Sequence, residues 1–204
     1  RAWISVAMER KRWRNLPRGK RHILVDLADF STSIIDDGKV TFKTVTVVGA
    51  NEKDRRSPEF SDSMEHMVLN PTWNVPRSIT VKEYLPLMQE DPTAVGHLEM
   101  YDQSGEMVSR DNLDFNDYTE EDFPFDLKQP PSRGNALGLV KFMLPNRFNI
   151  YLHDTPEKSL FGYEARAFSH GCIRLSDPFE FAYALLRRQV SNPEEYFQTR
   201  LASG

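Results

Sequence analysis

Cysteine is nearly absent from this sequence, with Cys172 the single one among 204 residues. No disulfide can therefore form within the chain, which suits a cytosolic protein or an exported one with a single working thiol. Long apolar runs are also missing, so no segment is expected to span a bilayer. The net charge of −4 provides no positive excess. We therefore expect neither nucleic acid nor an anionic membrane surface as a partner.

We expect no signal peptide within these residues, because Arg1 opens directly into helix-like sequence. We expect the chain to continue a longer precursor. Membrane anchoring is then expected only through a region before residue 1. The hydrophobic content of 39% and aromatic content of 11% are typical of a globular protein. The length suits one domain with an inserted lobe.

The two signs of charge gather in different segments. Residues 1–22 carry eight Lys and Arg against one acid, and residues 99–126 carry ten Asp and Glu against one base. We interpret both segments as solvated surfaces. Residues 1–20 are predicted to form a helical connector, with Trp3 and Trp13 on an apolar face that packs against a neighbour.

Strand signals dominate the rest of the chain. Residues 22–49 alternate apolar and polar residues around Asp37-Gly38, a hairpin turn pair. Further strands are expected at 64–70, 138–146 and 148–155. Helices are expected near the end, capped by Asp177 before Pro178 and by Asn192 before Pro193. The fold class is therefore predicted as mainly β with peripheral helices (α+β), with residues 191–204 as a C-terminal helix or tail.

Residues 71–134 interrupt the strand pattern and are predicted to form an inserted lobe. Thr80 and Glu83 have the spacing of a capping box, which indicates a helix near 81–90 that Pro86 shortens or kinks. Residues 91–134 are polar, acidic and rich in Pro and Gly. A loop of that length is uncommon without a function.

The chemistry is concentrated in residues 169–174, which read Ser-His-Gly-Cys-Ile-Arg. A free thiol with a pKa of about 8.5 needs a nearby imidazole to form the nucleophilic thiolate at neutral pH. If the segment is extended, His170, Cys172 and Arg174 point to one side. Gly171 would let the backbone approach a substrate, and Arg174 would suit a substrate carboxylate.

Two histidines are candidates for the base, His170 beside the thiol and His153 at the end of a predicted strand. Spacing alone does not choose between them. A lone cysteine is more often a small buried hydrophobe, but its polar and cationic neighbours argue against that interpretation here. A zinc site made by His153, His170 and Cys172 is an alternative that lacks a convincing fourth ligand. The remaining histidines are interpreted as ordinary core or surface residues: His22, His66 and His97.

These residues resemble the signature of the L,D-transpeptidases with a YkuD-type catalytic domain. That signature is a histidine, a gap, then Ser/Thr-His-Gly-Cys, an apolar residue and Asn or Arg; here His153 precedes Cys172 by 19 residues. Residues 70–79, 135–146 and 151–156 look like the Gram-negative subgroup with a large capping lobe. The resemblance implies a catalytic domain over residues 21–190 with a β-sandwich-like core.

The resemblance also implies roles for single residues. His153 would be the base of Cys172, and the backbone carbonyl of Asp154 would orient its ring. His170 would bind substrate or stabilise charge, and the N–H groups of Gly171 and Cys172 would form the oxyanion hole. Substrate contacts are expected from a further set of residues: Arg174, Ser169, Tyr151, Trp73, Asn74 and Arg77.

The implied reaction is acyl transfer between peptidoglycan stem peptides in the periplasm, through a thioester on Cys172 and without a metal or organic cofactor. D-Alanine would leave a stem tetrapeptide, and an amine of a second stem would close a 3→3 cross-link. Carbapenem β-lactams are expected to acylate the same thiol. Three alternatives stay open: a cysteine carboxypeptidase or amidase acting on wall peptides, attachment of a protein to the wall, and a non-catalytic wall-binding module.

Overall fold

A sheet of eight strands organises the larger part of the chain. The computed structural model describes residues 2–13, 18–111 and 113–203. The strand order is β1-β2-β3-β11-β9-β8-β4, and β10 also pairs with β3. The strands are β1 (Arg21–Asp26), β2 (Ser31–Asp36), β3 (Lys39–Gly49), β4 (His66–Leu69), β8 (Val140–Met143), β9 (Leu152–His153), β10 (Ala167–Ser169) and β11 (Ile173–Leu175).

The long strand β3 joins the two halves of this sheet. Its first part, residues 39–45, pairs with β2, and residues 46–47 pair with β11. The hairpin between β2 and β3 turns at Asp37 and Gly38, as predicted, with φ of 48° and 79° at these two residues. Two positive φ values in succession form the turn that matches the twist of paired strands.

One apolar core lies between the two halves of the sheet and the C-terminal helices. It joins Ile34 of β2, Phe142 of β8 and Leu152 of β9 with residues of α4 (Pro178–Leu186) and α5 (Pro193–Ser203). The predicted class, mainly β with peripheral helices, is confirmed. The sheet is continuous through β3, and its two halves, β1-β2-β3 and β3-β11-β9-β8-β4, pack against the same core in a sandwich-like way.

The two helix starts that were predicted from the sequence differ in their caps. The Asn192 side chain accepts from the Glu195 N–H at 3.4 Å, as expected of an N-cap. Asp177 occupies the N-cap position before Pro178, as predicted, but its side chain makes no cap hydrogen bond to α4. Its carboxylate accepts instead from the Thr44 hydroxyl at 2.7 Å, which fastens α4 to β3.

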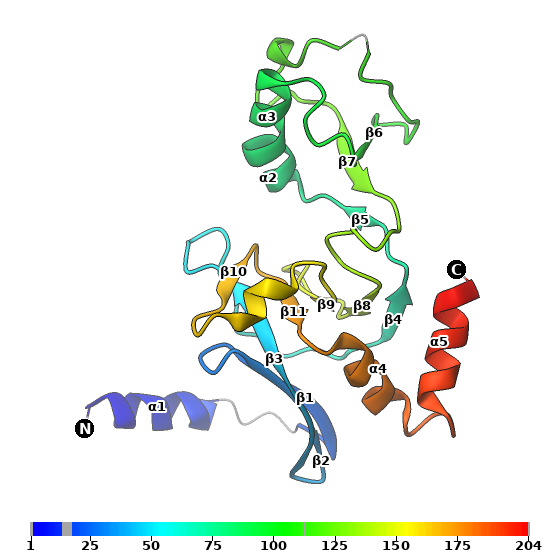
Figure 1. Cartoon of the computed structure of the whole chain (residues 1–204). Coiled ribbons are helices and arrows are strands. Elements are labelled where there is room, and N and C mark those ends of the chain that lie inside the picture. Colours follow the sequence, from blue (N-terminus) through cyan, green and yellow to red (C-terminus); the bar gives the residue numbers. More distant parts are fainter. Residues whose placement is uncertain (1, 14–17, 112, 204) are drawn as a thin grey trace.

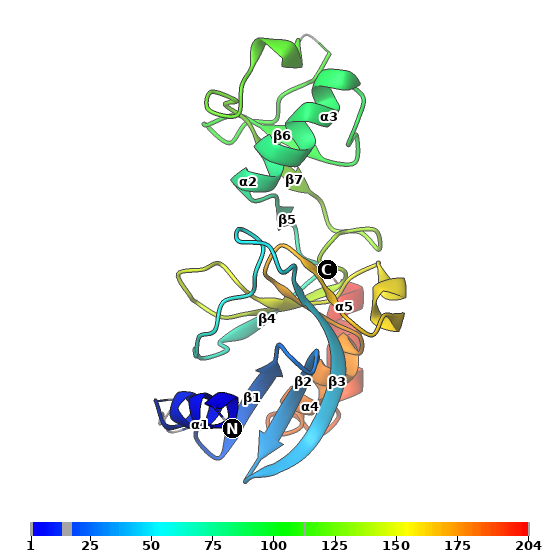
Figure 2. The same ribbon diagram turned by 90° about the vertical axis from the view of Figure 1, so that its left-hand side faces the viewer.

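A second body, built from residues 73–129, lies at one end of the molecule, away from the hairpin of β1 and β2 (Figures 1 and 2). It has its own three-stranded sheet and its own apolar core, in which Leu85, Met88, Phe115 and Leu127 are almost fully buried. Its elements are β5 (Trp73–Asn74), α2 (Arg77–Ile79), η1 (Thr80–Tyr84), α3 (Leu85–Glu90), β6 (Glu99–Tyr101), η2 (Phe115–Asp117) and β7 (Asp126–Gln129). We call this body the lobe.

The lobe helix begins earlier than the sequence indicated. Helical structure starts at Arg77 and runs through the π-helical turn η1 into α3. Thr80 therefore lies inside the helical stretch, and the predicted capping box is wrong. Pro86 is tolerated because it occupies the first turn of α3, directly after the wide turn.

The N-terminal helix α1 (Ala2–Trp13) lies apart from both cores (Figure 1). Its Trp3 side chain is 86% exposed, so the expected packing of this residue against a neighbour is wrong. The side chain of Trp13 lies outside what the structure describes. Among the described residues, no helix combines the length and apolar character needed to cross a membrane.

Candidate active site

Three neighbouring strands place polar side chains on one face of the sheet. Lys141 of β8 pairs with His153 of β9, which pairs in parallel with Arg174 of β11. Residues directly opposite each other on paired strands share a face. The flanking row of Phe142, Leu152 and Ile173 is buried in the main core, so the polar row faces the other way, and we call its surface the catalytic face.

Tyr151 and Cys172 extend the catalytic face by one step along each strand. Each lies two residues before a member of the polar row, and the Ile173 N–H donates to the Tyr151 carbonyl at 3.0 Å. The Tyr151 ring lies 5.7 Å from the His153 ring, between centroids. The thiol of Cys172, a half-buried residue, donates to the Asn149 carbonyl at 3.8 Å. The residue is therefore partly exposed and is not part of the main apolar core.

The His153 ring is fixed in one tautomer by its neighbour. The residue is only 4% exposed, and its Nδ1–H donates a short hydrogen bond to the backbone carbonyl of Asp154. Since a carbonyl can only accept, Nδ1 carries the proton and Nε2 keeps its lone pair. This is the orientation that the family resemblance implies for a base.

The Asp154 carboxylate holds the loop that carries this carbonyl. It accepts from the Leu139 N–H at 3.0 Å, from the Thr155 N–H at 2.7 Å and from Lys158 Nζ at 2.7 Å. Gly138, with φ of 60°, lies so close that a Cβ there would sit 2.3 Å from the carboxyl carbon. The backbone carbonyl of Asp154 thus orients the His153 ring, and its carboxylate stabilises the surrounding loop by hydrogen bonds.

Burial keeps both reacting groups neutral. Burial raises the pKa of the Cys172 thiol, and hydrogen bonds from Tyr151 and the charges of Arg174 and Lys141 offset only part of this. Burial, with the positive charge of Arg174, lowers the pKa of His153 to about 3. At neutral pH the pair is therefore a thiol beside an unprotonated imidazole, which suits a base that removes the proton as the sulfur attacks.

The chain is not extended through residues 169–172, which corrects the sequence-based expectation. Gly171 has φ of 115°, so the backbone turns between β10 and β11. A Cβ on Gly171 would lie 2.9 Å from Ile150 Cδ1, inside the protein, so this glycine serves the turn and not the approach of a substrate. Cys172 and Arg174 keep a common face, and His170 departs from it.

Ser169 fastens the same turn. Its side chain is buried, donates to the Cys172 carbonyl at 2.6 Å and accepts from the Gly171 N–H at 3.1 Å. Its hydroxyl is therefore engaged within the turn. Of the two predicted oxyanion donors, the Gly171 N–H is already engaged, which leaves the Cys172 N–H.

His170 reaches from this turn to the lobe. Its Nε2 lies 2.6 Å from Oε1 of Glu83, and the same oxygen accepts from Arg55 Nη2 at 2.5 Å. Glu83 belongs to η1 of the lobe, whereas Arg55 and His170 belong to loops of the main body. One carboxylate therefore joins the lobe to His170, two residues before Cys172.

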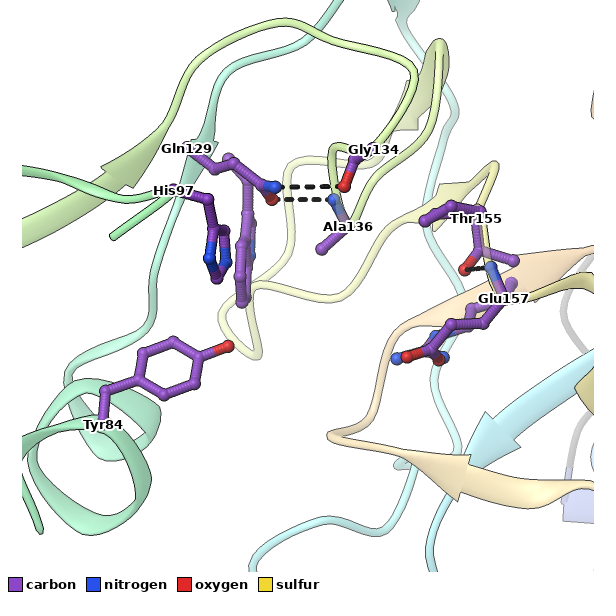
Figure 3. A pocket seen from close by; sticks show the side chains of 10 residues that line it. Tyr84, His97, Gln129, Gly134, Ala136, Thr155 and Glu157 are labelled. Atoms are coloured by element: carbon purple, nitrogen blue, oxygen red, sulfur yellow. Dashed lines mark hydrogen bonds and ion pairs between the residues drawn. The ribbon is translucent and has the colours of Figure 1, made fainter. Parts of the chain in front are cut away.

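Arg174 is not free to grip a carboxylate, because it is ion-paired with Glu157. The pair borders a cavity of about 200 Å³ between the lobe and the main body. Figure 3 shows Tyr84 and His97 on the lobe side of this cavity and Glu157 on the opposite side, with the Tyr84 hydroxyl directed into the space.

The structure separates the three expected binding residues of the lobe. Trp73 lines the cavity. Asn74 is exposed on β5 and does not line it. Arg77 donates to the Glu120 carbonyl at 3.1 Å and lies over the Phe123 ring, so it stays within the lobe.

Several residues of the site were not predicted from the sequence. Lys141 lies on the catalytic face because the register of β8 and β9 pairs it with His153. His97 was interpreted as an ordinary histidine, but it lines the cavity. Glu83 and Glu157 belong to the site because they form ion pairs with His170 and Arg174, respectively. The alternative of a zinc site finds no support, since no three His, Cys, Asp or Glu side chains gather around a common point within the described ranges.

The comparisons with known proteins agree with this geometry. The sequence profile of the YkuD family, described as the L,D-transpeptidase catalytic domain, matches residues 20–190. A curated protein of Haemophilus influenzae named "Putative L,D-transpeptidase" is 31% identical over 185 residues, which cover 90% of this chain and 37% of that protein. The chain belongs to the YkuD family of L,D-transpeptidase catalytic domains.

The chain spans little more than a third of the length of this curated relative. A solved L,D-transpeptidase from Mycobacterium smegmatis aligns with a TM-score of 0.39 and 15% identity, covering 86% of this chain and 56% of that one. That structural similarity is too low to support an argument about the site. The assignment to the family rests on the sequence match.

Proposed function

We propose that this chain forms 3→3 cross-links between peptidoglycan stem peptides through a thioester on Cys172. The sulfur attacks the carbonyl of the third residue of a tetrapeptide, and the bond to D-alanine breaks. An amine of a second stem then attacks the thioester and regenerates the thiol. The observation that carries the proposal is that Cys172 and His153 share the catalytic face of two adjacent strands.

His153 would carry the proton through both steps. Its pKa of about 3 leaves the ring unprotonated at neutral pH, with Nε2 free to accept the thiol proton. The imidazolium formed in this step then gives the proton to the departing amine of D-alanine. In the second step the ring takes a proton from the attacking amine and returns it to the sulfur. The two steps leave the enzyme unchanged.

The negative charge of the tetrahedral intermediate needs fixed donors. The Cys172 N–H is the candidate at the turn, since the Gly171 N–H is bonded to Ser169. The lobe would cover the catalytic face during the reaction and limit water, so that the thioester meets an amine before it is hydrolysed. The cavity between Trp73, Tyr84 and Glu157 would hold part of a stem peptide.

Two further expectations complete the proposal. The reaction places the chain in the periplasm, where peptidoglycan is the substrate. A carbapenem presents a strained carbonyl to the same sulfur and would form a stable acyl-enzyme.

Product analysis tests the proposal. The chain is incubated with purified disaccharide-tetrapeptide, and products are separated and identified by mass. We expect a dimer joined between two third residues together with released D-alanine, and neither product from Cys172→Ala. Tripeptide without dimer would contradict transfer and identify a carboxypeptidase, whereas unchanged substrate with the wild type would contradict the activity altogether.

A further inference from the structure

Lys141 is a cation on the catalytic face that the proposed mechanism leaves unused. It is the Cα partner of His153 in the antiparallel pairing of β8 and β9. Along β8, the buried residues Val140 and Phe142 alternate with the half-buried Lys141. The side chain therefore leaves the sheet on the same side as His153.

The Lys141 ammonium lies over the ring that borders the sulfur. Its Nζ is 4.9 Å from the centre of the Tyr151 ring. Tyr151 is itself buried, and its backbone and hydroxyl are among the groups that lower the pKa of Cys172 by hydrogen bonding. The ammonium and the thiol are thus separated by a single aromatic side chain.

The other cations near the catalytic face already have carboxylate partners. Arg174 pairs with Glu157, and Lys158 pairs with Asp154 at 2.7 Å. Lys141 makes no ion pair with any carboxylate among residues 2–13, 18–111 and 113–203. A half-buried cation loses hydration, and this loss favours a nearby anion as its partner. The first anion that forms on this face in the proposed reaction is the Cys172 thiolate.

We propose that Lys141 stabilises the negative charge of the Cys172 thiolate as it forms, and so sets how readily the sulfur is ionised. This inference rests on the proposed role of Cys172 as the nucleophile. The charged and titratable groups on or beside the catalytic face are Tyr151, directly before β9, His153 on β9, Arg174 on β11 and Lys141 on β8, with His170 in the adjoining turn; Tyr151, Arg174 and Lys141 act on the sulfur directly. Lys141 is the one among them that keeps a positive charge without a carboxylate partner in the described structure.

The pairwise electrostatics agree with this geometry. Burial lowers the pKa of Lys141, and the negative charge at Cys172 raises it in return. The charge of Lys141 lowers the pKa of the thiol and also that of His153. A cation at this position therefore favours the thiolate, and it keeps the His153 ring unprotonated before the sulfur attacks.

The rate of Cys172 alkylation by iodoacetamide, followed against pH, measures this effect directly. The chain has one cysteine, so each adduct reports on this sulfur, and the reagent is uncharged. We compare the wild type with Lys141→Met, Lys141→Gln and Lys141→Arg. The matched control is Lys128→Met, because Lys128 lies over the Tyr101 ring of the lobe at 3.9 Å in the same kind of contact.

We expect the midpoint of alkylation to move upward by about one pH unit in Lys141→Met and Lys141→Gln, which is roughly tenfold slower alkylation at a fixed pH below the midpoint. Lys141→Arg keeps the charge and should return the midpoint close to that of the wild type. Lys128→Met should leave it unchanged. Superimposable profiles for the wild type and both neutral variants would overturn the inference, and so would an equal shift in Lys141→Arg.

Thermal melting of each variant accompanies the titration. If the Met variant does not fold, the Gln variant carries the comparison, since it keeps a polar end at the border of the cleft. The titration does not depend on peptide transfer. A shifted profile without cross-linked product would therefore support the role of Lys141 while contradicting the proposed function.

Discussion

Oε1 of Glu83 in the lobe lies 2.6 Å from Nε2 of His170, the residue two positions before the nucleophile. The same oxygen accepts from Arg55 Nη2 at 2.5 Å. The three side chains are about one-third exposed, at 33% for Glu83, 33% for His170 and 35% for Arg55. The lobe is therefore fastened to the main body, two residues before Cys172, by a partly solvated contact.

Replacing Glu83 by Gln should loosen this contact without unfolding the chain. A partly exposed ion pair contributes on the order of 1 kcal/mol. We expect faster hydrogen exchange of the backbone amides in η1 and, from the same free energy, about fivefold slower acylation of Cys172. Hydrogen-exchange mass spectrometry and the rate of carbapenem adduct formation measure the two effects.

The control for this variant is Lys82→Gln. Lys82 precedes Glu83 in η1. It pairs at 3.6 Å with Asp54, the neighbour of Arg55 in the chain, but it has no hydrogen bond to His170. It should acylate like the wild type. If both variants slowed acylation equally, the effect would belong to the general charge of η1 and the link through Glu83 would be refuted.

Gly171 should not tolerate a side chain. Its φ of 115° lies in a region that other residues avoid, and the new Cβ would meet Ile150 Cδ1 at 2.9 Å. Gly171→Ala should lower the free energy of unfolding by about 1–3 kcal/mol and displace the Cys172 N–H. Urea denaturation measures the free energy of unfolding, and the acylation rate reports on the displacement of the Cys172 N–H.

Gly162→Ala is the matched replacement, because a Cβ at Gly162 would meet nothing within 4 Å. It should leave stability and acylation close to the wild type. Equal behaviour of the two alanine variants would show that the turn at Gly171 does not need its backbone conformation.

The hairpin and the fold class could be predicted because they depend on local signals. Asp37-Gly38 favours a turn in any context. Residues 169–174 by themselves indicate Cys172 as a candidate nucleophile. The lobe was indicated by a loss of strand pattern over residues 71–134. Its internal core, which joins residues from 75 to 127, gives that segment a structure of its own.

What could not be predicted depends on register and on contacts between distant elements. Lys141 reaches the site only because β8 pairs with β9 at His153, and a shift by one residue would turn it into the core. The ion pair of Arg174 with Glu157 joins residues whose contact depends on the fold, so its partner could not be identified from the sequence. The extended form expected for residues 170–174 failed because Gly171 has a positive φ, which no spacing rule reveals.

Acid should destabilise the fold through His153. Its ordinary pKa of 6.5 falls to about 3 in the folded chain. Between these two values the unfolded chain binds a proton that the folded chain does not, so stability is complete above pH 6.5 and declines as the pH falls toward 3. From pH 6.5 to 4.5 this one group should cost the wild type about 2 kcal/mol.

His153→Gln should remove this part of the pH dependence, whereas His66→Gln, at an exposed position on β4, should keep it. Urea denaturation at several pH values measures the slopes. Parallel curves for the wild type and His153→Gln would contradict a buried, unprotonated ring.

The account depends most on Cys172 being an accessible nucleophile, and intact mass spectrometry after incubation with a carbapenem tests this most directly. We expect the wild type to gain the mass of one carbapenem, on the peptide that contains Cys172. Cys172→Ala should gain none, and His153→Gln should react much more slowly. A wild type that never gains mass, or an adduct that persists in Cys172→Ala, would contradict the account.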